Sequence, residues 1–112
     1  MLSSRAAVPL FALLCCGTAE ADVDRGRALL AQYQCGTCHA IPGVPASRGE
    51  VAQPLAAWSQ RSYIAGRVPN RIESLARWIV APQSLVPGTT MPAMGVSPAD
   101  AQAMAAYLFS LE

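Results

Sequence analysis

The sequence contains no lysine and a single histidine, so its charge and its metal-binding capacity are both narrowly limited. Its 112 residues carry eight arginines against seven acidic residues, which leaves a net charge of +1. A balance this close to neutral provides neither the basic surface that binds nucleic acid nor an acidic tail. We therefore expect no nucleic-acid partner, and the length allows at most one compact domain.

The first 21 residues have the three parts of a secretory signal peptide. Arg5 supplies a positive start, residues 6–16 form an apolar run, and residues 19–21 (Ala-Glu-Ala) are a small-x-small cleavage site. As a membrane anchor the run is too short, because a span needs about 20 apolar residues and Pro9 interrupts this one. We expect cleavage after Ala21, which leaves residues 22–112 as an exported domain with no permanent membrane span.

Two of the four cysteines, Cys15 and Cys16, lie inside this leader and are expected to leave with it. Lipid modification of one of them is an alternative, although a lipidated cysteine normally follows a small residue and Leu14 precedes Cys15. Cys35 and Cys38 are then the thiols that remain.

The mature chain is poor in large aliphatic side chains. Its 91 residues include 19 Val, Ile, Leu and Phe, together with eight Pro and seven Gly. A domain of this size buries a small share of its surface, so it usually needs a disulfide, a metal or a cofactor. The composition therefore predicts an added hydrophobic body.

Three segments have the period of amphipathic helices, whereas no segment alternates as a strand does. Caps and prolines mark their boundaries. The expected helices run from Asp22 or Asp24 to about Gln34, from the N-cap Asn70 to the stop at Pro82, and from Ser97-Pro98 toward the end of the chain. The expected fold class is all-α, with long Pro/Gly-rich loops over residues 40–63 and 81–96, which are long enough to wrap a functional group.

The five residues Cys35-Gly36-Thr37-Cys38-His39 match the pattern for covalent attachment of haem c. Two thiols three positions apart project to one side of a helical turn, where they can add to the two vinyl groups of one porphyrin. The next residue, His39, then brings an imidazole nitrogen to the iron. The pattern predicts one haem c, bound through Cys35 and Cys38, with His39 as an iron ligand.

Three other interpretations of these residues stay open. A structural disulfide would suit an oxidising compartment, but it leaves His39 without a role. A structural zinc site needs four protein ligands, and the mature chain offers two Cys and one His. A thioredoxin-like redox pair expects a preceding strand, whereas a helical pattern precedes this motif.

Counting the candidate residues narrows the choice of the second ligand to the haem iron. His39 is the one histidine in the chain, so a second imidazole from the same molecule is excluded. A thioether ligand must then come from one of three methionines. Met104 lies on the apolar stripe of the last helix, where a core role is the ordinary explanation. Met91 and Met94 lie in a Pro/Gly-rich loop, and both stay candidates.

The chain resembles the monohaem class I cytochromes c of bacterial periplasms. The resemblance covers nearly all of residues 22–112 and implies a cytochrome c fold, with three or more helices wrapped around the haem, in the periplasm. It rests on the attachment motif and on the order and spacing of Arg25-Gly26-Arg27, Pro54-Leu55, Ser62-Tyr63-Ile64-Ala65-Gly66, Leu75-Ala76-Arg77-Trp78-Ile79, Pro87-Gly88-Thr89-Thr90-Met91-Pro92 and Ala105-Ala106-Tyr107-Leu108.

The resemblance also implies roles for single residues. Met91 is the distal iron ligand, with Met94 as the fallback. The carbonyl of Pro54 accepts a hydrogen bond from the far ring nitrogen of His39, although Gln53 stands where the family usually has Gly. Gly26 allows the first helix to cross closely over the last one near Tyr107.

The two haem propionates need polar partners, because a buried charge must be paired or hydrogen-bonded. We expect Arg61, Tyr63 and Trp78 to donate to them. The alternatives are that Trp78 is a core aromatic and that Arg61 is a solvated charge. Trp58 is interpreted as packing over the haem edge.

With His and Met both bound, the iron has no free position for a substrate, so we expect a one-electron carrier rather than an enzyme. Its partners would be redox proteins, such as a dehydrogenase, a bc-type complex or a terminal oxidase, and it would act as a monomer or within a complex. A dedicated c-type subunit of an exported dehydrogenase or oxidase is the main alternative. A haem enzyme or sensor would need a displaceable Met.

Overall fold

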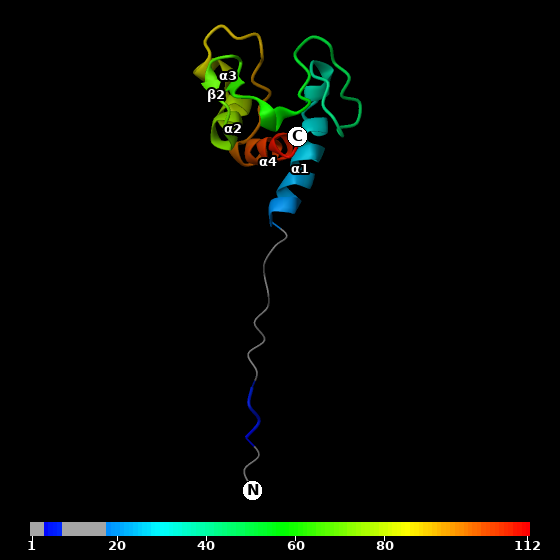
Figure 1. Cartoon of the computed structure of the whole chain (residues 1–112), viewed down its shortest axis with the longest axis vertical. Coiled ribbons are helices and arrows are strands. Elements are labelled where there is room, and N and C mark those ends of the chain that lie inside the picture. The colour runs from blue at the N-terminus through cyan, green and yellow to red at the C-terminus, as the bar shows by residue number, and fades with distance from the viewer. Residues whose placement is uncertain (1–3, 8–17) are drawn as a thin grey trace.

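The computed structural model describes residues 4–7 and 18–112, and its folded part consists of helices joined by long loops (Figure 1). The elements are α1 (Thr18–Gln32), η1 (Cys35–Thr37), η2 (Trp58–Gln60), β1 (Tyr63–Ile64), β2 (Val68–Pro69), α2 (Ile72–Val80), α3 (Pro82–Leu85) and α4 (Pro98–Phe109). The all-α prediction is confirmed. The antiparallel pair β1–β2 was not predicted, because two-residue strands are too short to show alternation.

Helix α1 begins earlier and ends earlier than the sequence predicted. It starts at Thr18 rather than at Asp22 or Asp24, and it ends at Gln32 because Gln34 takes a left-handed conformation with φ of 58°. The predicted leader covers residues 1–21, of which 1–3 and 8–17, including Cys15 and Cys16, lie outside the described residues. No helix in the described ranges has the length and apolarity needed to cross a bilayer.

Asn70 does not cap α2, which corrects the sequence prediction. The N-cap is Arg71, with extended backbone and no capping hydrogen bond from its side chain. The amide of Asn70 donates instead to the backbone carbonyls of Trp58 and Arg61. At the other end α2 stops at Val80, and Pro82 opens the short helix α3.

Helix α4 begins where the sequence predicted. The Ser97 hydroxyl accepts a hydrogen bond from the backbone N–H of Asp100 at 3.1 Å, and Pro98 occupies the first turn, where its missing N–H costs nothing. The predicted core role of Met104 is confirmed, because its side chain is completely buried. Helix α4 packs against α1 on one side and α2 on the other (Figure 1).

The crossing of α1 and α4 depends on Gly26. A Cβ atom at this position would overlap the backbone carbonyl of Ala103, so only glycine allows the two helices to approach this closely. The predicted close crossing is confirmed, but its contact is Ala103 rather than Tyr107. The Tyr107 hydroxyl instead donates to the carbonyl of Pro42 and fixes the loop that follows the cysteine motif.

Candidate functional site

The two cysteines and His39 lie on one tight turn. The turn opens at the left-handed Gln34 and forms the 3-10 helix η1, and the backbone N–H groups of Cys38 and His39 both donate to the carbonyl of Cys35, at 3.3 and 3.1 Å. Both thiols are free and half-buried, so the disulfide alternative does not describe this structure. Burial raises the pKa of the Cys35 thiol.

The loop that follows His39 packs against this turn. The N–H of Gly49 donates to the carbonyl of Gly36 at 3.0 Å. A Cβ at Gly49 would overlap the backbone of Thr37 and Cys38, and one at Gly36 would overlap Ser47. Two backbone segments therefore pack in direct contact, and this contact fixes the direction in which the thiols project.

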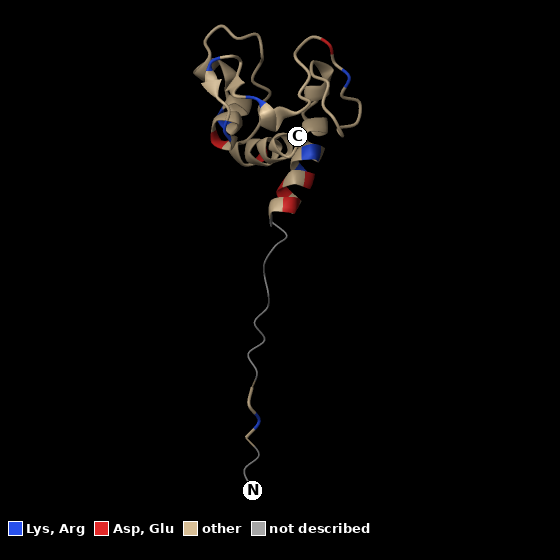
Figure 2. Ribbon diagram, in the orientation of Figure 1, with Lys and Arg blue, Asp and Glu red and all other residues tan. Residues whose placement is uncertain are grey.

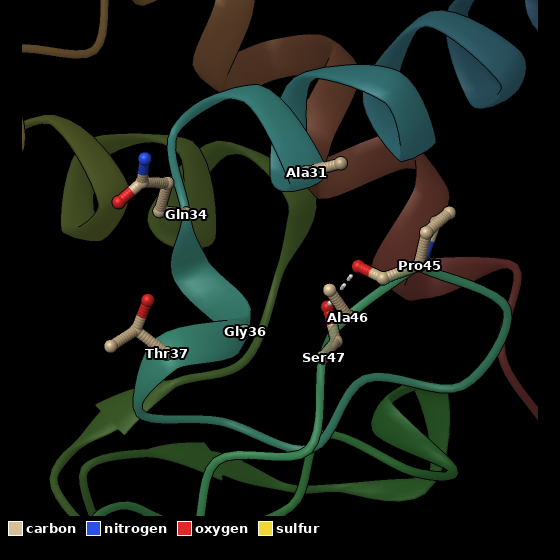
Figure 3. Close-up of a pocket in the computed structure, with 7 residues that line it drawn as sticks. All are labelled: Ala31, Gln34, Gly36, Thr37, Pro45, Ala46 and Ser47. Atoms are coloured by element: carbon tan, nitrogen blue, oxygen red, sulfur yellow. Dashed lines mark hydrogen bonds between the residues drawn. The ribbon is translucent and has the colours of Figure 1, made fainter.

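A small pocket of about 270 Å³ lies beside this packing contact (Figure 3). In Figure 3 the Ser47 hydroxyl points to the carbonyl of Pro45, at 3.4 Å. The lining includes neither thiol and not the imidazole of His39, so the pocket is not where a group bound by these residues would lie. Its lining residues are Ala31, Gln34, Gly36, Thr37, Pro45, Ala46 and Ser47.

The imidazole of His39 is oriented by a backbone carbonyl. Its Nδ1 lies 2.6 Å from the carbonyl oxygen of Gln53. Since a carbonyl can only accept, Nδ1 carries the proton, and in the neutral ring Nε2 is left free to bind a metal. The predicted acceptor, Pro54, is wrong by one residue, because the Pro54 carbonyl is taken by the Arg61 guanidinium.

Arg61 connects the segment Gln53-Pro54 to Trp58. One guanidinium nitrogen donates to the side-chain oxygen of Gln53 at 2.9 Å and another to the carbonyl of Pro54. The guanidinium carbon lies 5.0 Å from the centre of the Trp58 ring, within the range of a cation–π contact. Arg61 is therefore a half-buried, anchored cation, and the solvated-charge alternative does not describe it.

Trp58 provides the test of whether a haem fits these residues. Its indole Nε1 is buried and has no hydrogen-bond partner in the described part of the chain. A buried donor without an acceptor costs about 1–3 kcal/mol, so a group present in the assembled protein should supply one. A propionate carboxylate beside the Arg61 cation would do so. The residues fit a haem, and Trp58 offers a donor in addition to the packing that the sequence suggested.

The other two predicted donors lie in contrasting places. Tyr63, on β1, has a side chain that is 57% exposed, with no hydrogen bond from its hydroxyl within the described ranges. Trp78, on α2, is 7% exposed and belongs to the hydrophobic core, as its alternative interpretation expected. Propionate contacts by Tyr63 and Trp78 stay predictions.

The candidate distal ligands differ in burial. Met91 is half-buried and packs against the core, whereas Met94 is 46% exposed. The carbonyl of Met91 accepts a hydrogen bond of 2.6 Å from the side-chain amide of Gln83 on α3. Nothing in the sequence marked Gln83 for this role, because the contact joins a side chain to a backbone atom in a loop.

Two further interpretations of the cysteine motif find no support in the structure. Within residues 4–7 and 18–112, no three His, Cys, Asp or Glu side chains form a cluster that could hold a metal, as structural zinc would require. A helix, α1, leads into the motif, where a thioredoxin-like site would have a strand.

Comparison with known proteins agrees with this geometry. The family model described as "Cytochrome c" matches residues 23–112. The chain is also 36% identical, over 94 residues that make up 83% of its length, to cytochrome c oxidase subunit 2 from Alkalihalophilus pseudofirmus. It spans about a quarter (27%) of that relative's length. On the family match, the chain belongs to the cytochrome c family, and its prosthetic group is a haem c held covalently through Cys35 and Cys38.

Proposed function

We propose that this chain is an exported one-electron carrier whose haem iron is ligated by His39 and Met91. The bound haem c supplies a metal that changes between ferric and ferrous states. The partial burial of Met91 against the core is the observation that carries this assignment, since Met94 is exposed and Met104 is enclosed in the α4 core. Ligation by both His39 and Met91 would leave the iron no open coordination position for a substrate.

The protein's own residues hold the site in one arrangement. Gln53 keeps the His39 ring in a fixed tautomer and orientation, which raises its strength as a ligand. Gln83 restrains the backbone of Met91. Arg61 and Trp58 offer donors to the propionates. A shell held in this way changes little between oxidation states, which favours rapid electron exchange.

The experiment that tests this proposal replaces the two loop methionines separately. Met91→Ala should abolish the methionine-to-iron charge-transfer band of the ferric protein and lower its reduction potential, while the haem stays covalently attached. Met94→Ala is the matched control and should leave both unchanged. Loss of the band in Met94→Ala, with retention in Met91→Ala, would assign the ligand to Met94. A wild-type protein without the band would favour a haem enzyme or sensor instead.

Export of the mature domain is part of the proposal. The apolar run 6–16 and the Ala19–Ala21 site support cleavage after Ala21 and a periplasmic location. Intact mass of the secreted protein should equal residues 22–112 plus one haem. A larger mass that includes a lipid on Cys15 or Cys16 would overturn cleavage at this site.

We further propose that the electron acceptor is a terminal oxidase. The similarity to a cytochrome c oxidase subunit 2 supports this choice over a dehydrogenase or a bc-type complex. The same similarity favours, as a second candidate, a dedicated subunit within an oxidase complex. Purification from a native membrane extract separates the two. A stoichiometric oxidase complex supports the subunit, whereas a free monomer that reduces added oxidase supports the shuttle.

A further inference from the structure

Asn70 is the one asparagine in the chain, and it lies between β2 and α2 without capping the helix. Both hydrogens of its side-chain amide are used on backbone carbonyls. Nδ2 lies 2.9 Å from the carbonyl oxygen of Arg61 and 3.3 Å from that of Trp58. Its own backbone N–H donates to the carbonyl of Ser62 at 3.0 Å. Asn70 thus holds residues 58–62 from one side.

The two carbonyls that Asn70 binds belong to residues with free donor capacity toward the haem. Trp58 has the unpartnered, buried indole Nε1, and Arg61 retains guanidinium N–H groups beyond the two that bind Gln53 and Pro54. Trp58 is the first residue of the short helix η2, and Arg61 is its C-cap. Fixing these two carbonyls restrains the direction of the indole relative to the guanidinium.

A second unpartnered atom belongs to Asn70 itself. Its side-chain oxygen is buried and has no donor within the described residues. A propionate oxygen could accept from Trp58 Nε1 but could not donate to this oxygen, whereas a water molecule could. Each of the two unsatisfied atoms therefore calls for a polar partner that the described residues do not supply.

We propose that Asn70 is the positioning residue of the propionate site, acting through Trp58 and Arg61. This inference rests on the proposed function, in which these two residues donate to the haem propionates. When the donors are held in place, they offset the propionate charge near the iron. When they are released, more of that negative charge acts on the iron and favours the ferric form, so the reduction potential falls.

The test measures the reduction potential and the Soret circular dichroism of holoprotein variants, above the pH at which the propionates titrate. Asn70→Ala should lower the potential and change the Soret signal, although Asn70 has no direct contact with the haem in this scheme. Trp58→Phe, which keeps the ring but removes the donor, should also lower it. The double variant should shift by less than the sum of the two single shifts.

Gln60→Ala is the matched control, since this exposed residue lies on η2 and the one hydrogen bond of its side chain within the described residues goes to Ser59. It should leave the potential unchanged. Asn70→Leu, which keeps the approximate shape and removes both donors without adding a charge, serves if the alanine variant yields no holoprotein. A purely structural role would lower the melting temperature without moving the potential.

Three outcomes would overturn the inference. They are a wild-type potential in Asn70→Ala or Asn70→Leu, additive shifts in the double variant, and an unchanged potential in Trp58→Phe. The last decides the matter if neither Asn70 variant folds. Failure of the proposed function is a separate result, because it shows in the wild-type protein as an absent haem or an absent methionine–iron band.

Discussion

The two sides of the haem site are built differently. On the attachment side, residues 35–55 are held by backbone hydrogen bonds between distant parts of the loop. Ala52 donates to Cys38 at 2.9 Å, Leu55 to Ala40 at 2.8 Å, and Gly49 to Gly36 at 3.0 Å. On the methionine side, no backbone N–H from residue 90 to residue 96 donates such a bond within the described chain.

The methionine loop, residues 86–97 between α3 and α4, is instead held in place by few contacts. Gln83 binds the Met91 carbonyl, Thr89 donates to Val86 at 3.1 Å, and Val96 is buried. No charged residue occurs between Arg77 and Asp100, and in Figure 2 the loop that runs above α2 and leads to α4 is tan throughout. The difference indicates that the protein itself prepares the attachment side, whereas under the proposed ligation a bond from Met91 to the iron would organise the other side.

Removal of both thiols should have the largest effect. In Cys35→Ala/Cys38→Ala the haem can no longer be anchored, and the thin core loses the hydrophobic body that completes it. We expect no haem in the intact mass and loss of most helical circular dichroism. Thr37→Ala, an exposed position between the cysteines, is the control and should keep the haem. A folded, helical double variant without haem would show that the protein prepares both sides alone.

Two glycine substitutions compare the sides directly. Gly49→Ala forces a methyl group into the backbone of Thr37 and Cys38, and should cost about 3 kcal/mol in free energy of unfolding. Gly88→Ala meets open space and pays only for its φ of 84°, about 1 kcal/mol. Denaturant unfolding of the two holoproteins measures both. Equal costs would contradict the comparison.

A third test concerns the hydrogen bond that joins the attachment side to the methionine side. Tyr33, just before the attachment turn, donates at 2.8 Å to Asp100, which follows the methionine loop at the start of α4 and also pairs with Arg25. The hydrogen bond to the Asp100 carboxylate raises the pKa of Tyr33 above its ordinary value of 10.0. This stabilisation is complete below about pH 10 and is lost as the pH rises through the raised value.

The stability of the holoprotein should therefore fall in strongly alkaline solution, and Tyr33→Phe should reduce the fall. Denaturation midpoints measured against pH provide the readout. Val51→Ala, on an exposed side chain that does not titrate, is the control and should keep the wild-type slope. An identical slope in Tyr33→Phe would remove this contact from the account.

The features that sequence predicted best depend on residue type. The Ser97-Pro98 start of α4, the buried Met104 and the requirement for glycine at position 26 follow from capping, hydrophobicity and the absence of a side chain. The attachment motif is also of this kind, because thiols and imidazole are the reacting groups themselves.

The features that sequence missed depend on backbone direction. Any residue could offer the carbonyl that orients His39, so Pro54 was chosen where Gln53 serves. Asn70 has a helix-capping pattern, yet its amide donates to the carbonyls of Trp58, the first residue of η2, and Arg61, its C-cap. The donor role proposed for Trp58 rests on its buried Nε1, which has no partner among the described residues, and no sequence pattern marks that atom.

One denaturant titration tests the central claim that the protein prepares the attachment side and the iron bond organises the methionine side. The methionine–iron charge-transfer band and the far-ultraviolet circular dichroism are followed in the same sample of ferric holoprotein. The account predicts that the band is lost at a lower denaturant concentration than the helical signal, with the haem still attached. Coincident transitions for the two signals would contradict it.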